Sequence, residues 1–185
     1  MTSAASELQV DYLVKSLGGR AGTAIFVRGG EVAKLTRESE SGLFRLKAAD
    51  GKRAWVLDPR VGGEARPFSL KATRAGSEKG EPELLIRNHL FEYEGKHYLF
   101  AGVPEGRPLR DFLSGKRYIC RLDALEPLRG DIDHMTWHSL RRIRGPIVGE
   151  LDGVGAIGHH VLLSPELEPV GLILSAASYI MYSTG

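Results

Sequence analysis

Apolar and polar residues alternate along most of the first 122 positions, which is the pattern of half-buried strands. In the first run, Leu8, Val10, Tyr12 and Val14 occupy every second position. Two-residue turn signals separate several later runs, among them Gly29-Gly30, Asp50-Gly51 and Glu94-Gly95. The runs predicted as strands are residues 7–14, 23–28, 31–37, 43–48, 53–57, 68–73, 83–93, 96–101 and 116–122.

The segments between and after these runs are less regular. Residues 58–67 and 75–82 are rich in Pro and Gly and are predicted as loops, and residues 107–114 as a short helical turn. Residues 131–144 fit a helix that Gly145-Pro146 would end, or two strands with a break near residue 139; we favour the helix. Residues 147–163 are strand-like with a break at residues 152–153, and the glycines at 155 and 158 indicate a bulge or a close backbone approach.

The C-terminal segment is the most informative part of the pattern. Ser164-Pro165 and Glu168-Pro169 each resemble a helix start, and the residues from Val170 to Tyr182 carry no charge and are apolar on every helical face. A helix of about 14 residues is shorter than the roughly 20 needed to cross a bilayer. We therefore predict a helix from about Pro169 to Tyr182 that is buried by surrounding sheet; a membrane tail and a helix lying on one sheet face are the alternatives.

This ending resembles a known superfamily. The strand, proline, acidic turn and apolar helix from Val161 to Tyr182 look like the end of the phospholipid scramblases, and Phe44 to Lys52 is similar to the strand and Asp-Gly turns of the same group. That group is the tubby C-terminal-domain superfamily, which also includes the LURP-one-related proteins. The resemblance implies a closed antiparallel β-barrel wrapped around a central hydrophobic C-terminal helix, and we expect residues 1–185 to form one such domain, mainly β in class.

The resemblance has limits that bear on function. Scramblases usually carry an acidic residue late in the helix, where Ser178 or Tyr179 stands here, and the chain has neither a cysteine cluster nor a calcium-loop pattern of that type. Scramblase activity is therefore not implied. The residues with which tubby proteins bind phosphoinositides have no matching motif in this sequence.

Composition and charge narrow the function further. The chain of 185 residues has an ordinary globular composition and a net charge of +2, and all 25 of its Lys and Arg residues lie at or before Arg144. This modest basic character makes a dedicated nucleic-acid binder less expected. The only cysteine, Cys120, lies in a predicted strand, and a single buried thiol without a signal-peptide pattern favours the reducing cytoplasm.

Two histidine pairs are the candidates for metal chemistry. His134 and His138 are spaced i, i+4, which on a helix places both rings on one face, but the Glu of a zinc-protease motif is absent. His159 and His160 are neighbours in a predicted strand, so their side chains should point to opposite faces and not share a metal. We predict no metal site and no cofactor, and keep a small metal-assisted hydrolase that uses His134 and His138 as an alternative.

The basic residues provide the preferred hypothesis. The densest run is Arg141, Arg142 and Arg144, and Lys116-Arg117 is a smaller one. Arginine offers a planar fork that suits phosphate groups. We therefore predict a non-enzymatic binding module in which these five residues bind an anionic ligand, such as a phosphoinositide head group or another phosphate-bearing partner. A regulatory or scaffold domain that binds another protein remains a further alternative.

Overall fold

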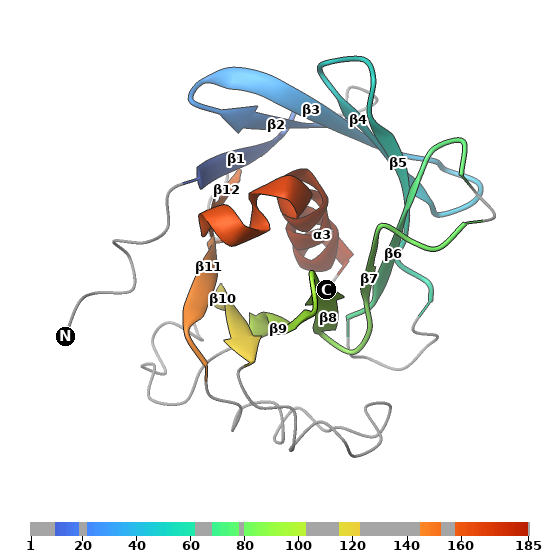
Figure 1. Cartoon of the computed structure of the whole chain (residues 1–185). Helices are drawn as coiled ribbons and strands as arrows, with labels where there is room; N and C mark the ends of the chain where they lie inside the picture. The colour runs from blue at the N-terminus through green and yellow to red at the C-terminus, as the bar shows by residue number, and fades with distance from the viewer. Residues whose placement is uncertain are drawn as a thin grey trace.

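The chain folds into a nearly closed, twelve-stranded antiparallel barrel around one C-terminal helix (Figure 1). The computed structural model describes residues 10–18, 22–61, 68–77, 80–102, 115–122, 145–152 and 158–184. Its strands are β1 (Val10–Ser16), β2 (Thr23–Val27), β3 (Gly30–Arg37), β4 (Phe44–Ala48), β5 (Ala54–Asp58), β6 (Leu70–Arg74), β7 (Leu84–Ile86), β8 (Leu90–Tyr93), β9 (Lys96–Gly102), β10 (Lys116–Leu122), β11 (Ile147–Asp152) and β12 (His159–Leu163). The barrel that the sequence predicted is therefore confirmed as a fold.

Strand order explains how the barrel closes. Strands β1 to β7 pair in sequence order, as do β8 to β12, and β1 pairs with β12 to join the two halves. At the other seam, an antiparallel bridge between Arg87 and Leu90 links the strands β7 and β8. The two edges left at this seam are short, since β7 has three residues and β8 has four.

The C-terminal helix fills the interior of this barrel. A 3-10 helix, η5 (Pro165–Val170), leads from β12 into α3 (Gly171–Thr184), which Figure 1 shows ringed by the strands. Leu174, Ala176, Ala177 and Ile180 are each 0% exposed although they lie on different helical faces. Burial on all sides is what the uncharged sequence requires. The predicted buried helix is confirmed, except that its α-helical part begins at Gly171 because residues 165–170 wind more tightly.

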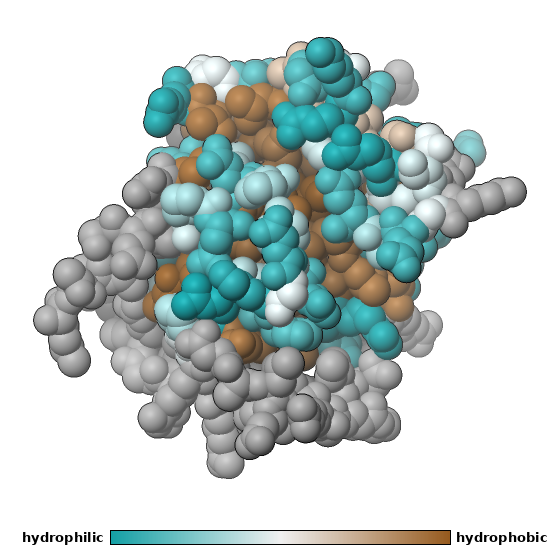
Figure 2. Space-filling view, in the orientation of Figure 1, coloured by the Kyte–Doolittle hydropathy of each residue, from teal (hydrophilic) through white to brown (hydrophobic). Residues whose placement is uncertain are grey.

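Polar contacts fix both ends of the helix. At its start, Tyr98 Oη donates a hydrogen bond to Glu166 Oε2 at 2.8 Å, and the Arg121 guanidinium donates to the other carboxylate oxygen at 3.3 Å. At its end, Tyr182 Oη donates to the carbonyl oxygen of Gly115 at 2.6 Å. Figure 2, which looks onto the mouth where the helix begins, shows hydrophilic residues over this end with apolar residues visible between them.

One predicted strand is wrong in its extent. The run from residue 83 to residue 93 is two strands, β7 and β8, because Asn88 and His89 between them have φ values of +50° and +66°. The turn is held from outside, since the His89 amide donates to the carbonyl of Phe68 at 2.9 Å and His89 O accepts from the Phe100 amide at 2.6 Å. The β2–β3 turn also differs by one residue: it uses Arg28-Gly29, not Gly29-Gly30.

Some of the remaining predictions concern residues that the structure describes, and others do not. Cys120 is buried in β10, as expected of a strand thiol. Gly158 is a close backbone approach, because an added Cβ would lie 2.4 Å from the carbonyl oxygen of Val14. Residues 107–114 and 131–144 lie outside the described residues. Within the described part of the chain, no helix has both the length and the apolar character that a membrane crossing requires.

Candidate functional site

Three lysines form a row across the outer face of the barrel. In the register of strands β1 to β4, Lys15 lies opposite Ala24, Ala24 opposite Lys34, and Lys34 directly opposite Lys47. Their sequence neighbours, among them Val14 and Leu35, are buried in the core. Because strand side chains alternate, all three lysines of this "lysine row" project outward.

The charges of the lysine row are poorly compensated. Lys34 and Lys47 are exposed, and Lys34 Nζ lies 4.0 Å from Glu31 Oε1. Among the described residues, no carboxylate forms an ion pair with Lys15 or Lys47. Like charges directly opposite each other on neighbouring strands destabilise a sheet. The row is therefore a place where an added anion would relieve repulsion.

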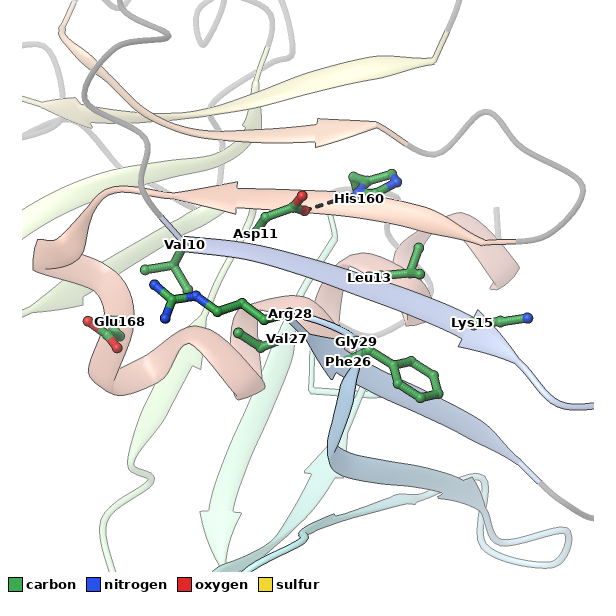
Figure 3. A pocket seen from close by; sticks show the side chains of 10 residues that line it. All are labelled: Val10, Asp11, Leu13, Lys15, Phe26, Val27, Arg28, Gly29, His160 and Glu168. Carbon is green, nitrogen blue, oxygen red and sulfur yellow. Dashed lines mark hydrogen bonds and ion pairs between the residues drawn. The ribbon is translucent and has the colours of Figure 1, made fainter.

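A groove adjoins the lysine row at Lys15 (Figure 3). It has a volume of about 730 Å³. Its lining combines outward-facing residues of β12, β1 and β2 with Val10 and Val27, which pack against the core, and with Glu168 of η5. Leu13 lies opposite His160 on one side and Phe26 on the other, so these side chains form the strip next to the lysine row. Lys15 lines the groove and also belongs to the lysine row, which makes the two features continuous. We call this feature the outer groove.

Charged residues are placed unevenly in the outer groove. In Figure 3, Lys15 and Phe26 lie at one end, and Arg28 extends at the other end towards Val10 and Glu168. Between these ends, His160 Nδ1 is 3.0 Å from Asp11 Oδ1, so this acid has a partner of its own. The apolar side chains of Leu13 and Phe26, which we call the apolar strip, thus lie next to Lys15. Among the described residues, no carboxylate forms an ion pair with Lys15.

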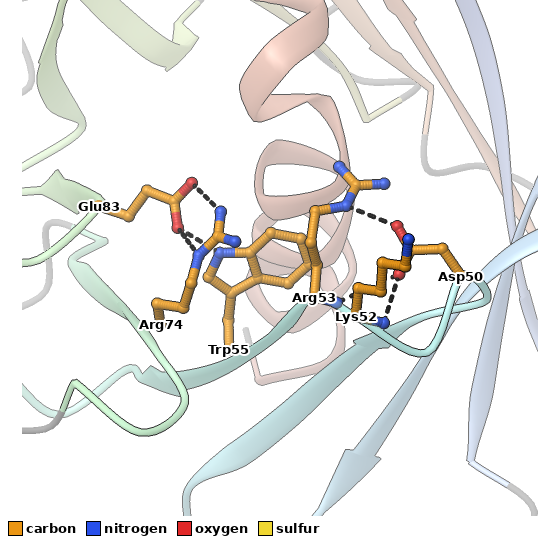
Figure 4. Close-up of polar contacts among 6 residues, drawn as sticks. All are labelled: Asp50, Lys52, Arg53, Trp55, Arg74 and Glu83. Atoms are coloured by element: carbon orange, nitrogen blue, oxygen red, sulfur yellow. Dashed lines mark hydrogen bonds and ion pairs between the residues drawn. The ribbon is translucent and has the colours of Figure 1, made fainter.

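A second cluster of charges, around Trp55, is already satisfied (Figure 4). The guanidinium groups of Arg53 and Arg74 lie 5.8 and 5.3 Å from the Trp55 ring centroid, and Arg74 pairs with Glu83 at 3.0 Å. Arg53 pairs with Asp50 at 2.9 Å. Hydrogen bonds from the Lys52 amide and from Arg53 lower the pKa of Asp50 to about 2. Both arginines have an acidic partner here, so this cluster ties neighbouring turns together.

The two adjacent histidines of β12 point to opposite faces, as predicted. His159 is buried inside the barrel with Nε2 3.1 Å from Ser178 Oγ of the helix, and its ring stacks on Tyr179 with centroids 6.1 Å apart. His160 is on the outer face with Asp11. Ser178 is 0% exposed, so this Ser–His contact has no access for a substrate and secures the helix in the barrel.

The buried His159 makes stability depend on pH. Burial, followed by the nearby charge of His160, lowers the pKa of His159 to about 4 from its ordinary value of 6.5. The neutral ring thus stabilises the fold above pH 6.5, and this stability is lost as pH falls from 6.5 towards 4. We expect the free energy of unfolding, measured in urea, to fall by about 2 kcal/mol more between pH 7 and pH 5 in the wild type than in His159→Gln. Equal slopes in the two proteins would contradict this assignment.

Of the five predicted anion-binding residues, the structure describes Lys116 and Arg117. Lys116 Nζ lies 3.5 Å from Glu150 Oε2 and 5.6 Å from the Tyr118 ring centroid. Arg117 is the next residue along β10 and lies opposite the core residue Leu151, where its charge acts on Tyr182 inside the barrel. These two side chains thus face opposite sides of the sheet. Arg141, Arg142 and Arg144 lie outside the described residues, so their role stays a prediction.

The metal alternative also depends on residues beyond the described ones. His134 and His138 both lie outside them. In the ranges that the structure describes, no group of three or more His, Cys, Asp or Glu side chains is arranged to hold a metal ion. Neither fact tests the predicted absence of a metal site, which stays a prediction.

Sequence reasoning did not identify the lysine row or the outer groove. Lys15, Lys34 and Lys47 are separated by 19 and 13 positions, and only the strand register places them side by side. The available signal was alternation: each lysine follows or precedes an apolar core position in a predicted strand. A search for outward-facing cations on neighbouring hairpins would have found the pair Lys34 and Lys47. A search for dense basic runs favoured Arg141 to Arg144 instead.

No protein-family model, no curated protein and no solved structure gave a significant match to this chain. The functional argument therefore depends on the geometry of the lysine row and the outer groove.

Proposed function

We propose that this protein is a non-enzymatic binding module that recognises a phosphate-bearing anionic partner through the lysine row. The observation that carries the proposal is the direct opposition of Lys34 and Lys47, with Lys15 in the same row and little acidic compensation. An anion placed over the row would bring opposite charge to three amino groups held on a rigid sheet. We also propose a distant relation to the tubby C-terminal-domain superfamily, because a barrel around an apolar C-terminal helix is the fold that the resemblance implies.

The packed interior of the barrel favours a ligand site on the surface over one inside the barrel. The helix side chains pack against the inward residues of the strands, and Leu174, Ala176 and Ala177 are each 0% exposed. A barrel filled in this way leaves its core for packing and not for a ligand. The basic outer face is therefore the better candidate for recognition.

The test is binding to lipid vesicles of defined charge. We expect the protein to bind phosphatidylcholine vesicles that contain phosphatidylserine, to bind pure phosphatidylcholine weakly, and to be released as salt is raised. Lys34→Gln/Lys47→Gln should weaken this binding roughly tenfold or more, since each lysine near an anionic surface contributes about 1 kcal/mol. Sedimentation of the vesicles with bound protein measures the effect.

A second double variant controls for net charge. Lys71→Gln/Lys96→Gln removes the same two charges at sites where each lysine is near an acid: Lys71 lies opposite Asp58, and Lys96 is 3.9 Å from Glu166. We expect its binding to stay within about threefold of the wild type. Equal loss in both double variants would contradict a local site, and binding of soluble inositol phosphate without vesicle binding would assign the row to a free phosphate ligand.

A further inference from the structure

The outer groove and the lysine row meet at one residue, Lys15, and this junction has the chemistry of an amphipathic site. On β1, Leu13 and Lys15 face outward two residues apart, and β2 adds Phe26 beside Leu13. Side chains on one strand face that are two residues apart are separated by about 7 Å. A ligand of modest size can therefore contact the apolar strip and the first lysine at the same time.

The size and lining of the outer groove fit a small molecule. Its volume of about 730 Å³ lies within the roughly 300 to 1,000 Å³ of ligand pockets. Its lining combines Leu13, Phe26 and two valines with four charged residues, Asp11, Lys15, Arg28 and Glu168. Leu13 and Phe26 are only half-buried although they are large apolar residues on the outer face. Covering them with an apolar chain would remove their remaining surface from water.

Charge complementarity sets which end of the ligand lies where. At the Lys15 end, the groove is followed by Lys34 on β3 and Lys47 on β4, so a negative group there lies in the positive field of the row. Away from this end, Asp11 is occupied by His160 at 3.0 Å, and Glu168 lines the groove beside Arg28. An anionic head is therefore favoured at Lys15, with the apolar tail directed along Leu13 and Phe26.

We propose that the outer groove binds a single monoacyl lipid with an anionic phosphate head, whose acyl chain covers Leu13 and Phe26 while its phosphate contacts Lys15 and Lys34. This inference rests on the proposed function and deepens it, because it names the class of anionic ligand and adds an apolar contact to the lysine row.

The experiment titrates the whole protein by calorimetry with a monoacyl glycerophosphate below its critical micelle concentration. Glycerol 3-phosphate supplies the head without the chain, and a monoacylglycerol supplies the chain without the phosphate. We expect each of these to bind at least tenfold more weakly than the complete lipid. Phe26→Ala should weaken binding of the complete lipid about tenfold, because much of one aromatic contact is lost. Val56→Ala truncates a half-buried residue of the outer face on β5, away from the groove, and should stay within twofold of the wild type.

A fluorescent variant keeps the test independent of the stability of Phe26→Ala. Phe26→Trp places an indole in the groove, and its emission should shift to shorter wavelength with the monoacyl glycerophosphate but not with glycerol 3-phosphate. An unchanged emission with the complete lipid would overturn the inference.

The outcomes separate this inference from the proposed function. If vesicles bind through the lysine row but the monoacyl lipid binds no more tightly than glycerol 3-phosphate, the inference is wrong and the proposed function stands. If the lipid binds with equal affinity to the wild type and to a Lys15→Gln/Lys34→Gln variant, an anionic head at the row is excluded and the inference fails. Loss of binding in both this variant and Phe26→Ala, with Val56→Ala unaffected, supports it.

Discussion

Replacing Ala177 by Asp is expected to abolish folding of the whole barrel. Ala177 is 0% exposed in the middle of α3, and its neighbours Ala176 and Ser178 are equally buried. A carboxylate at this position would be removed from water, and burial of an unpaired charge costs several kcal/mol. The added volume costs a further 1–3 kcal/mol or so in a close-packed core. Together these terms approach the total stability of an ordinary domain, which is about 5–15 kcal/mol.

The matched control uses the same substitution at the end of the same helix. Ser183 is exposed, so Ser183→Asp places the carboxylate in water and costs only about 0.3–1 kcal/mol through the helix dipole. We expect Ser183→Asp to be folded by circular dichroism and resistant to limited proteolysis, and Ala177→Asp to be neither. A folded, protease-resistant Ala177→Asp would contradict the enclosure of α3.

The elements that could be predicted are those whose signals are local. The turn at Glu94-Gly95 lies where it was predicted, and both of its residues have positive φ. Strand β10 has the predicted limits, Lys116–Leu122. The enclosed helix was predictable because thirteen uncharged residues leave no polar face for water. These features follow from turn chemistry and periodicity, which need no knowledge of the partner strands.

The features that were missed depend on tertiary contacts. Asn88 and His89 adopt positive φ without being glycine, and the conformation is held by hydrogen bonds to Phe68 and Phe100, which are distant in sequence. The lysine row depends on register, since a shift of one residue in the β3–β4 pairing would turn Lys34 and Lys47 to opposite faces of the sheet. Register across several hairpins is set by the exact turn residues, and the β2–β3 turn already differed by one position.

Gly171→Ala is expected to destabilise the protein by about 1–3 kcal/mol, although alanine is the better helix former. Gly171 has φ −60° and ψ −38°, so its backbone conformation suits any residue, and helix propensity alone would make the change stabilising by about 0.5–1 kcal/mol. An added Cβ, however, would lie 2.1 Å from Tyr12 Oη and 2.6 Å from its Cζ. Tyr12 is only 4% exposed, so its ring has little room to move away. Urea unfolding of the wild type and of Gly171→Ala shows whether the free energy of unfolding falls or rises.

A control variant and a double-mutant cycle test whether contact with Tyr12 causes the loss of stability in Gly171→Ala. Gly30→Ala adds a Cβ whose nearest neighbour is the Val27 carbonyl oxygen at 3.7 Å, an ordinary contact, so we expect a change of less than about 0.5 kcal/mol. In Tyr12→Phe the closest atom is removed, and Gly171→Ala should therefore cost less in that background than in the wild type. The difference between the two costs is the coupling between the residues. A stabilised Gly171→Ala, or the same cost in both backgrounds, would show that α3 does not enter the barrel against Tyr12.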